Sequence, residues 1–323
     1  MSLREITDGI HCISGSKDSI FIVCASYEDR ARAAVQMLDQ YKVDHSVIFR
    51  SKEYATKGNT PANFDAIRTA LQSVSFRAPQ VVEFSIDRPI PSMFEFEHLC
   101  KIWQSSSPLE NITVDITTFP RQELLLLLRV LASLPNRPTI RLIYAEPEKY
   151  DTEEGENGWL TRGVKSVRSV PGFGGVQPPG MGKLLIMLLG HEEERAAITW
   201  KRHNPKKTIV ITSEPSFRNG LKGIVEKKNP LFFLDFGDTL IHKGVPARGI
   251  NETATAILEY SKEYSESYFT VVAPYGTKLQ ALGVFKAARI QPKIQITYAV
   301  PSIYNYEAYS RGIGPTWELV PWS

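Results

Sequence analysis

The sequence lacks the features that define membrane and secreted proteins. Its longest apolar runs are Leu124–Leu128 and Leu184–Leu189, far shorter than the roughly 20 apolar residues that a membrane span needs. Residues 1–14 have no long apolar core and no cleavage pattern, so we expect no signal peptide. We therefore expect a protein that does not use a membrane as a partner.

Cysteine is scarce. The chain has three cysteines, Cys12, Cys24 and Cys100, and they are widely spaced. No CxxC pair and no Cys/His spacing of a metal site is present, so we expect no metal held in this way. Three reduced thiols are typical of a cytosolic protein, which predicts a cytoplasmic location. The sequence leaves the cofactor unknown.

The chain also lacks a strong excess of charge. Its formal net charge is +3, and Lys and Arg are spread along the sequence. A charge this small gives no strong indication of nucleic-acid binding. The densest basic cluster flanks a predicted loop and is typical of a solvated helix end; its residues are Lys201, Arg202, Lys206 and Lys207.

Nucleotide-site motifs are missing or incomplete. GxGxxG and GxSxG do not occur. Gly180–Lys183 resembles the end of a P-loop, but Gln177 stands where glycine is needed and Leu184 where Ser or Thr should hold magnesium. Leu234–Leu240 resembles the nucleophile loop of haloacid-dehalogenase-type phosphatases, but its second aspartate comes one residue too late.

What the chain does have is an internal repeat. The length of 323 residues predicts about two domains, and three short motifs recur in the same order. The matched pairs are Tyr27–Ala31 with Glu192–Ala196, Tyr144–Tyr150 with Tyr298–Tyr304, and Thr161–Val164 with Ser310–Ile313. This order predicts two copies of one unit. Duplicated units tend to pair around a pseudo-twofold axis, so the matched loops are expected to face one shared site.

Apolar runs alternate with helical patterns in both halves. Strands are predicted at 19–25, 46–50, 80–86, 112–117 and 139–145, and again at 183–189, 208–213, 231–236, 268–273 and 293–299. Helices are predicted at 28–40, 62–75, 94–104 and 121–134, and again at 193–202, 217–226, 251–264 and 278–288. This alternation predicts an α/β fold with parallel sheets. We expect two tandem Rossmann-like units, at 1–165 and 183–323, joined by a Gly/Pro-rich linker at 166–182.

The first repeated motif follows the first strand of each half, where ligands bind in open parallel sheets. Helix capping explains the acidic residues, because acids are favoured in a first helical turn. It does not explain Arg30 and Arg195. The pairs Glu28/Arg30 and Glu193/Arg195 are therefore candidates for ligand binding or for a contact that holds the loops together.

The second candidate site follows the fourth strand of each half. Hydroxyls, a Gly or Pro turn and a cation at a helix start suit an anionic group. An ordinary strand-to-helix turn is the alternative. The candidate residues are Thr117, Thr118 and Arg121 in the first half, and Tyr275, Gly276, Thr277 and Lys278 in the second.

The third motif closes the fifth strand of each half. Tyr150 and Tyr304 are candidates for stacking on a base, or for packing under the following loop. Arg162 and Arg311 recur in matched context, which makes them better phosphate candidates than scattered surface lysines.

This layout resembles the CARF domain of prokaryotic antiviral systems, a Rossmann-like unit with functional loops after its first and fourth strands. Tyr275–Lys278 is similar to the second CARF loop, whereas Thr117–Arg121 departs from it by lacking glycine. Two such units in tandem resemble the SAVED domain. The resemblance implies binding of a cyclic oligonucleotide messenger. It also implies a protein partner as effector, because two such units fill the chain.

Three functions follow as hypotheses. The leading one is a cytoplasmic sensor that binds a nucleotide or other phosphorylated small ligand between its halves and acts through a partner in antiviral defence. The second is a metal-dependent nucleotide or nucleic-acid hydrolase. Its candidate carboxylates are Glu28, Asp29, Asp115, Glu193 and Glu194. The third is a scaffold subunit of a defence complex.

The anion-site hypothesis makes a prediction for the second loop. Arg121→Ala and Lys278→Ala are each expected to weaken binding of an anionic ligand by about 1–3 kcal/mol, because each removes a charge-assisted contact. Titration calorimetry measures the change. Unchanged affinity in both variants would contradict the anion-site interpretation.

Overall fold

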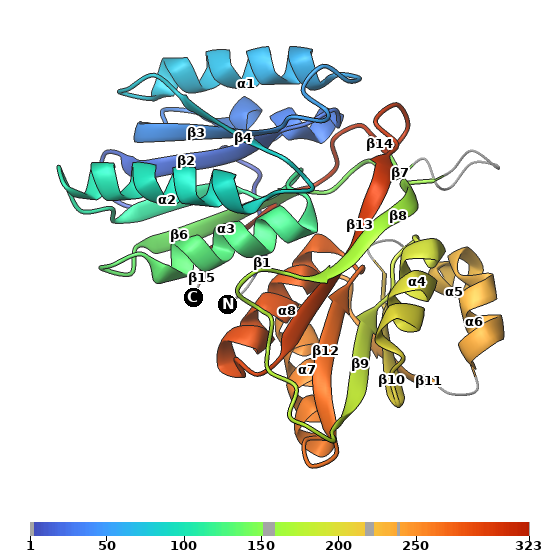
Figure 1. The fold of residues 1–323 in the computed structure, drawn as a ribbon. Coiled ribbons are helices and arrows are strands. Elements are labelled where there is room, and N and C mark those ends of the chain that lie inside the picture. Colours follow the sequence, from blue (N-terminus) through green and yellow to red (C-terminus); the bar gives the residue numbers. More distant parts are fainter. Residues whose placement is uncertain (1–2, 151–158, 217–222, 238–239, 323) are drawn as a thin grey trace. The chain divides into compact units, whose positions relative to one another are not determined.

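The chain forms two compact units in a computed structural model that describes residues 3–150, 159–216, 223–237 and 240–322. Unit 1 comprises Met1–Gly158 and Tyr306–Ser323, and unit 2 comprises Trp159–Asn305. The chain therefore leaves unit 1, builds all of unit 2 and returns to complete unit 1 (Figure 1). Among the helices of the described ranges, none has both the length and the apolar character that crossing a membrane requires.

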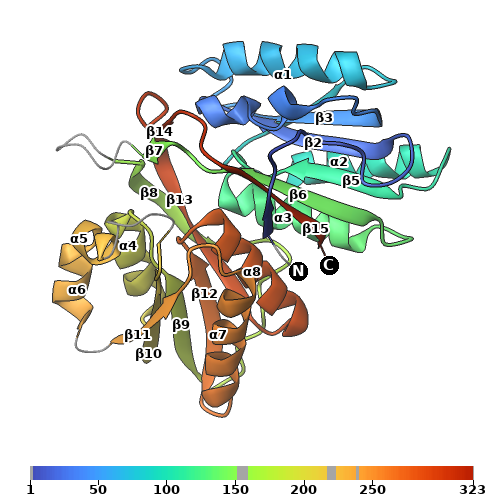
Figure 2. The ribbon, with the colours of Figure 1, turned by 180° about the vertical axis from the view of Figure 1, so that it is seen from behind.

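Unit 1 is built on a seven-stranded sheet (Figure 2). In sheet order its strands are β1 (Leu3–Glu5), β15 (Thr316–Trp322), β6 (Thr139–Ala145), β5 (Asn111–Asp115), β2 (Asp18–Ala25), β3 (Val43–Ser51) and β4 (Gln80–Phe84). The five strands from β6 to β4 are parallel, and β15 and β1 are antiparallel additions at one side. A short ribbon pairs β7 (Lys149–Tyr150) with β14 (Ser310–Arg311).

Unit 2 has a six-stranded sheet with the same plan. In sheet order its strands are β11 (Leu240–Val245), β10 (Lys207–Ser213), β9 (Gly182–Leu188), β12 (Tyr268–Pro274), β13 (Gln295–Tyr304) and β8 (Thr161–Ser169). If each unit's parallel strands are numbered along the chain, both sheets have the order 3-2-1-4-5, which is the order of the first five strands of the six-stranded Rossmann sheet. The predicted α/β class with two Rossmann-like units is confirmed.

Helices cover both faces of the unit 1 sheet. They are α1 (Thr60–Val74), α2 (Ile90–Gln104) and α3 (Arg121–Ser133). The apolar stripe of α1, which includes Ile67 and Leu71, packs on Phe21 and Ile48. On the opposite face, Phe49 contacts Phe96 of α2 and Phe119 just before α3. Alternating side chains of a buried strand thus fill two separate cores.

The helices of unit 2 are α4 (Glu193–His203), α5 (Ile224–Lys228), α6 (Pro230–Phe236), α7 (Ile250–Glu263) and α8 (Lys278–Ile290). The strand predicted at 231–236 is wrong, because this segment is α6 and the third parallel strand is β11. A run of apolar residues does not distinguish a strand from a helix, and Pro230 suits a first helical turn. Of the helix predicted at 217–226, residues 217–222 lie outside the described part.

The helix predicted at 28–40 is also wrong. The segment forms two short 3-10 helices, Asp29–Arg32 and Val35–Met37. Other segments take the carbonyls that an α-helix would use. The Asn63 side chain donates to the carbonyl of Glu28 at 3.0 Å, and the backbone N–H of Ile10 donates to the carbonyl of Met37 at 2.7 Å. Tertiary contacts thus override a favourable helical composition.

The strands β8 and β15 connect the chain in a way that the sequence did not indicate. β8 follows β6 of unit 1 in the sequence but pairs with β13 of unit 2, and β15 follows β13 but pairs with β6. The expected divisions at 165/166 and 182/183 therefore do not coincide with the ends of the compact units. The sequence of β8 is polar, so it does not show the apolar pattern of a buried strand. The strand nevertheless pairs with β13 and satisfies the backbone hydrogen-bonding groups along one edge of it.

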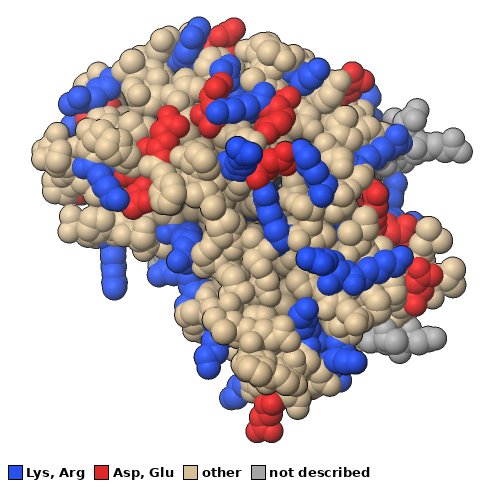
Figure 3. Space-filling view, viewed as in Figure 1, with Lys and Arg blue, Asp and Glu red and all other residues tan. Residues whose placement is uncertain are grey.

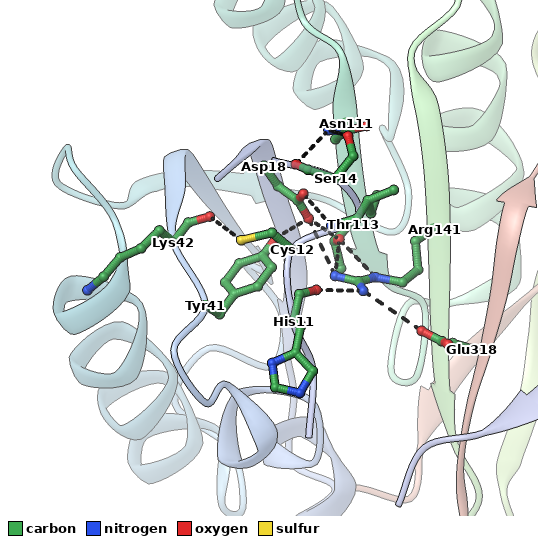
Figure 4. Close-up of polar contacts among 11 residues, drawn as sticks. His11, Cys12, Ser14, Asp18, Tyr41, Lys42, Asn111, Thr113, Arg141 and Glu318 are labelled. Atoms are coloured by element: carbon green, nitrogen blue, oxygen red, sulfur yellow. Dashed lines mark hydrogen bonds and ion pairs between the residues drawn. The ribbon is translucent and has the colours of Figure 1, made fainter. Parts of the chain in front are cut away.

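A buried polar network closes the amino-terminal end of the unit 1 sheet (Figure 4). The Asp18 carboxylate is fully buried and accepts hydrogen bonds from Tyr41 at 2.7 Å and Thr113 at 3.0 Å. Arg141 Nη2 lies 3.4 Å from the same oxygen and donates to Thr113 at 2.8 Å. Burial, followed by the Asp18 charge, raises the pKa of Tyr41 well above its usual value. The phenol therefore remains a donor.

Removing the cation of this network is expected to destabilise unit 1. Arg141→Ala leaves Asp18 buried without its countercharge, so we expect a loss of about 3–5 kcal/mol in the free energy of unfolding. Urea denaturation followed by circular dichroism measures it. The matched control is Arg4→Ala, because Arg4 pairs with Glu318 but its side chain is 79% exposed; we expect a change below about 1 kcal/mol. Equal effects of the two substitutions would contradict the stabilising role of Arg141 beside Asp18.

Candidate functional site

The loop after β2 in unit 1 contains a buried ion pair. One Glu28 carboxylate oxygen accepts from Arg30 Nε at 2.9 Å and Nη2 at 2.7 Å. The same oxygen accepts from the Ser310 hydroxyl at 2.6 Å. Arg30 is 1% exposed, and its Nη1 donates to the carbonyl of Ala145 at 3.0 Å. The pair therefore joins the carboxyl ends of β2 and β6 to the returning segment of the chain.

Unit 2 has corresponding contacts. Arg195 Nη1 donates to Glu192 at 2.7 Å, and its Nε donates to the carbonyl of Ala299, the counterpart of Ala145, at 3.0 Å. The Thr161 hydroxyl donates to Glu192, as Ser310 does to Glu28. The backbone N–H groups of the following glycines are also matched. Gly163 donates to Glu194 at 2.8 Å, and Gly312 donates to Asp29 at 3.2 Å.

The acidic partner in unit 2 differs from the predicted one. Arg195 pairs with Glu192, whereas Glu193 accepts from the backbone N–H of Phe232 at 2.8 Å. The cause is local conformation. The α4 helix begins at Glu193. Glu192, three residues before Arg195, therefore lies on the same side of the helix as Arg195, whereas Glu193, two residues before it, does not. In unit 1 the shorter spacing works because Glu28 is extended ahead of a 3-10 turn.

Arg195 is held among aromatic rings as well as beside a carboxylate. Its guanidinium carbon lies 4.8 Å from the Tyr275 ring centre and 4.7 Å from that of Tyr298. Burial alone lowers the pKa of Arg195, but Glu192 and the tyrosine oxygens outweigh burial and place this pKa well above its usual value. The Tyr275 hydroxyl bonds Thr199 at 2.6 Å, and burial raises the pKa of Tyr275 to about 12. Arg195 and Tyr275 therefore form part of the interior.

The loop after β5 places its hydroxyls against other strands. The Thr118 hydroxyl donates to the carbonyl of Cys24 at 2.5 Å, and the Thr117 hydroxyl accepts from the backbone N–H of Ala145 at 3.0 Å. Both threonines are buried, while Arg121 is half-buried as the first residue of α3. These hydroxyls tie strand ends together, as an ordinary structural turn does.

The matching loop in unit 2 forms a helix cap. Thr277 accepts from the backbone N–H of Gln280 at 3.1 Å, and the Gln280 side chain accepts from the N–H of Thr277 at 3.0 Å, which is a capping box. Gly276 is buried, and a Cβ there would lie 2.3 Å from the Gln280 side-chain oxygen. Lys278 is half-buried as the first residue of α8. The glycine is thus explained by the cap.

The remaining candidates lie in different environments. Tyr304 is buried, with its hydroxyl 3.2 Å from that of Tyr298, so it packs under the loop. The backbone of Tyr150 lies in β7, and its side chain is outside the described part. Arg162 is exposed and stacks over Trp159 at 4.5 Å. Arg311 is exposed and lines a cleft.

This cleft of unit 1 has a volume of about 390 Å³. Tyr27, Tyr306 and Tyr309 of its wall form a cluster with Tyr54. The ring centre of Tyr27 lies 5.7 Å from that of Tyr54 and 6.0 Å from that of Tyr309, and the ring centres of Tyr54 and Tyr306 are 6.2 Å apart. The lining residues are Tyr27, Asp29, Gly58, Asn59, Tyr306, Glu307, Tyr309, Ser310 and Arg311. The predicted site residues did not include these tyrosines, although the crowding of aromatic residues in Tyr304–Tyr309 is visible in the sequence.

Both the shape and the charge of the cleft have local causes. Gly58 has a φ of +51°, and a Cβ there would lie 2.8 Å from the carbonyl oxygen of Tyr306, so glycine permits this close approach. Burial and then the neighbouring Tyr309 and Glu28 raise the pKa of Tyr27 well above its usual value, so it remains a neutral phenol. Lys57, 5.8 Å from the Tyr306 ring centre, adds positive charge nearby.

Each carboxylate of the hydrolase hypothesis accepts a hydrogen bond from another group of the chain. Asp29 accepts from Gly312, and Asp115 accepts from the backbone N–H of Thr117 at 2.9 Å. Within the described ranges, the residues that gather within metal-binding reach are instead Glu214, Glu226 and His242. On the face shown in Figure 3, Lys and Arg are interspersed with Asp and Glu.

The fold is similar to that of known proteins, whereas the sequence is not. No family model matches the chain, and no curated protein matches its sequence. A type III CRISPR defence DNA nuclease activated by cyclic oligoadenylate has a TM-score of 0.55 and 9% identity, over 87% of this chain and 65% of that chain. The chain therefore spans slightly less than two thirds of that protein. At this identity the likeness shows a shared fold alone.

Two further structures are less similar. Can2 from Sulfobacillus thermosulfidooxidans in complex with cyclic tetra-adenylate has a TM-score of 0.29 and 18% identity, over 41% of this chain and 37% of that chain. The cytoplasmic domain of a prokaryotic cation chloride cotransporter has a TM-score of 0.25 and 6% identity, over 88% of this chain and 96% of that chain. TM-scores this low support no argument.

The buried pair of unit 2 gives a matched test of which glutamate matters. Glu192→Gln is expected to lower the free energy of unfolding by about 3–5 kcal/mol, because it leaves the buried Arg195 charge uncompensated. Glu193→Gln keeps the oxygen that accepts from Phe232, so we expect a change below about 1 kcal/mol. Differential scanning calorimetry of both variants measures this difference. A larger effect at Glu193 would contradict the observed pairing.

Proposed function

We propose that this protein is a sensor that binds a nucleotide or similar phosphorylated small ligand in the cleft of unit 1. The observation that carries the proposal is the position and lining of the cleft. Tyr27 and Asp29 follow the carboxyl end of β2, where Rossmann-like sheets bind ligands. Tyrosine rings suit the face of a base. Arg311 suits a phosphate, and the Asn59 side chain offers amide groups to polar edges.

The fold likeness directs the choice of ligand. A protein of similar fold is, by its description, activated by cyclic oligoadenylate, so cyclic oligoadenylates are the first ligands to test. In this proposal the protein acts in antiviral defence through a protein partner. We also propose that the two units arose by duplication. The shared strand order and the matched Arg contacts to Ala145 and Ala299 support this.

The hydrolase and scaffold hypotheses remain the alternatives, and one experiment separates all three. The full chain is mixed with cyclic tetra-adenylate, cyclic hexa-adenylate, linear oligoadenylates, ATP and AMP, and its melting temperature is recorded. A ligand at 100 times its Kd stabilises a protein by about 2.7 kcal/mol. Chromatography of the same mixtures, with and without Mg²⁺ or Mn²⁺, reports turnover. Stabilisation with the ligand intact supports a sensor, turnover supports a hydrolase, and no response supports a scaffold.

Substitutions in the cleft test whether the ligand binds there. Arg311→Ala is expected to weaken binding by about 1–3 kcal/mol through loss of a charge-assisted contact. Tyr309→Leu is expected to weaken it by a similar amount through loss of stacking, which is worth about 1–3 kcal/mol per base. Titration calorimetry with the stabilising ligand gives both values.

The matched control for these variants is Arg68→Ala, which removes an arginine of unit 1 whose side chain is 51% exposed on α1. We expect its affinity to equal that of the unmodified protein. If Arg311→Ala and Tyr309→Leu also bind with unchanged affinity, the ligand binds elsewhere and the assignment of the cleft is wrong.

A further inference from the structure

Three side chains with metal-ligating atoms meet at the β11 edge of the unit 2 sheet. Glu214 follows β10, Glu226 lies in α5 and His242 lies in β11. One ligand atom from each lies within 4.8 Å of the other two, and His242 Nε2 is 3.7 Å from Glu226 Oε1. Donors around one tetrahedral ion stand about 3.4 Å apart, because such bonds are about 2.1 Å long. Small side-chain rotations therefore bring all three to one ion.

A buried oxygen in this cluster is left without a donor. Glu226 Oε2 has almost no contact with solvent, and within the described part of the chain it has no hydrogen-bond partner. A buried acceptor that makes no bond costs about 1–3 kcal/mol, and more when it is charged. A cation that binds both oxygens of the Glu226 carboxylate removes this cost.

The backbone makes room for the second carboxylate. Gly244 lies in β11, two residues after His242, and a Cβ there would lie 3.1 Å from both Cβ and Oε2 of Glu214. A Cβ at 244 would require the Glu214 side chain to shift by a few tenths of an ångström. Glycine in a strand interior often marks such a close approach. Here it lets Glu214 lie over the strand that carries His242.

A hydroxyl connects two of the three side chains. Thr212 Oγ1 donates to Glu214 Oε1 at 3.2 Å and lies 2.8 Å from His242 Nε2. Because the Thr212 hydroxyl uses its proton to donate to Glu214, it acts as the acceptor toward His242, and Nε2 therefore carries the proton of that bond. Thr212 therefore holds both side chains close together. A metal ion at Nε2 would replace both the Nε2 proton and the hydrogen bond to Thr212, so the imidazole turns from Thr212 toward the carboxylates to bind it.

We propose that Glu214, Glu226 and His242 bind one divalent transition-metal ion, with Zn²⁺ as the first candidate. An imidazole nitrogen and carboxylate oxygens are all established zinc ligands, and two carboxylates balance the charge of the ion. Three protein ligands leave one position open for water or another ligand. The His242 side chain is 43% exposed, so the ion enters from solvent. This site is independent of the ligand proposed for the cleft of unit 1.

Metal titration of the purified full chain tests the proposal. After treatment with a chelator and its removal, the protein is titrated with Zn²⁺ by calorimetry, and we expect one ion per chain. Co²⁺ serves as a second probe, because its visible absorption reports coordination by protein ligands. His242→Ala and Glu226→Gln are each expected to weaken Zn²⁺ binding at least about tenfold, since even residues that only orient ligands cost 10–100-fold.

Two further variants make the result specific. Gly244→Ala keeps all three ligands but displaces Glu214, so we expect weaker Zn²⁺ binding with an unchanged melting temperature of the metal-free protein. His98→Ala, which removes a histidine of α2 in unit 1, should bind Zn²⁺ as the unmodified chain does. Absence of binding by the unmodified protein would overturn the proposal. Equal binding by His242→Ala, Glu226→Gln and His98→Ala would do the same.

Discussion

The architecture of each unit depends on one buried arginine that is bonded to both a carboxylate and a strand-end carbonyl. Removing a guanidinium and a carboxylate from water costs several kcal/mol per ion, which only close and multiple bonds offset. Arg30 and Arg195 meet this condition, since each is 1% exposed, pairs with a glutamate and donates to the last residue of the fifth parallel strand or its counterpart. These contacts fix the ends of the strands where Rossmann-like folds place their ligands.

The same pair fixes the wall of the cleft in unit 1. Glu28 accepts from Ser310, and Asp29 accepts from Gly312. Because these bonds hold Ser310 and Gly312, the neighbouring Tyr309 and Arg311 are positioned in the wall of the cleft that Tyr27 also lines. Of the acids that the sequence suggested, Glu28 and Asp29 thus bind the returning segment of the chain, and Asp29 also lines the cleft together with Tyr27.

The path of the chain decides which segments build the cleft. Residues 306–323 follow unit 2 in the sequence and belong to unit 1. They supply β15 to its sheet and three tyrosine or arginine side chains to its cleft. The metal-ligating cluster of unit 2, by contrast, comes from one stretch of the chain that runs from the end of β10 to β11. The two candidate sites thus have different chemistry, since tyrosines and charges of both signs line the cleft of unit 1, whereas two carboxylates and an imidazole form the cluster of unit 2.

The sequence by itself determined the alternation of strands and helices, and with it the two Rossmann-like units. Continuous apolar runs such as Ser19–Ala25 identify buried parallel strands, because burial on both faces leaves no polar alternation. It also identified Arg30 and Arg195 as residues that capping does not explain. Only the tertiary structure decided their partners, since choosing Glu192 over Glu193 depends on where α4 begins. Tertiary structure likewise decided the strand pairing of β8 and β15 and the gathering of Tyr27, Tyr54, Tyr306 and Tyr309. Contacts between residues so far apart in the chain leave no periodicity in the sequence, because they arise when separate segments pack together.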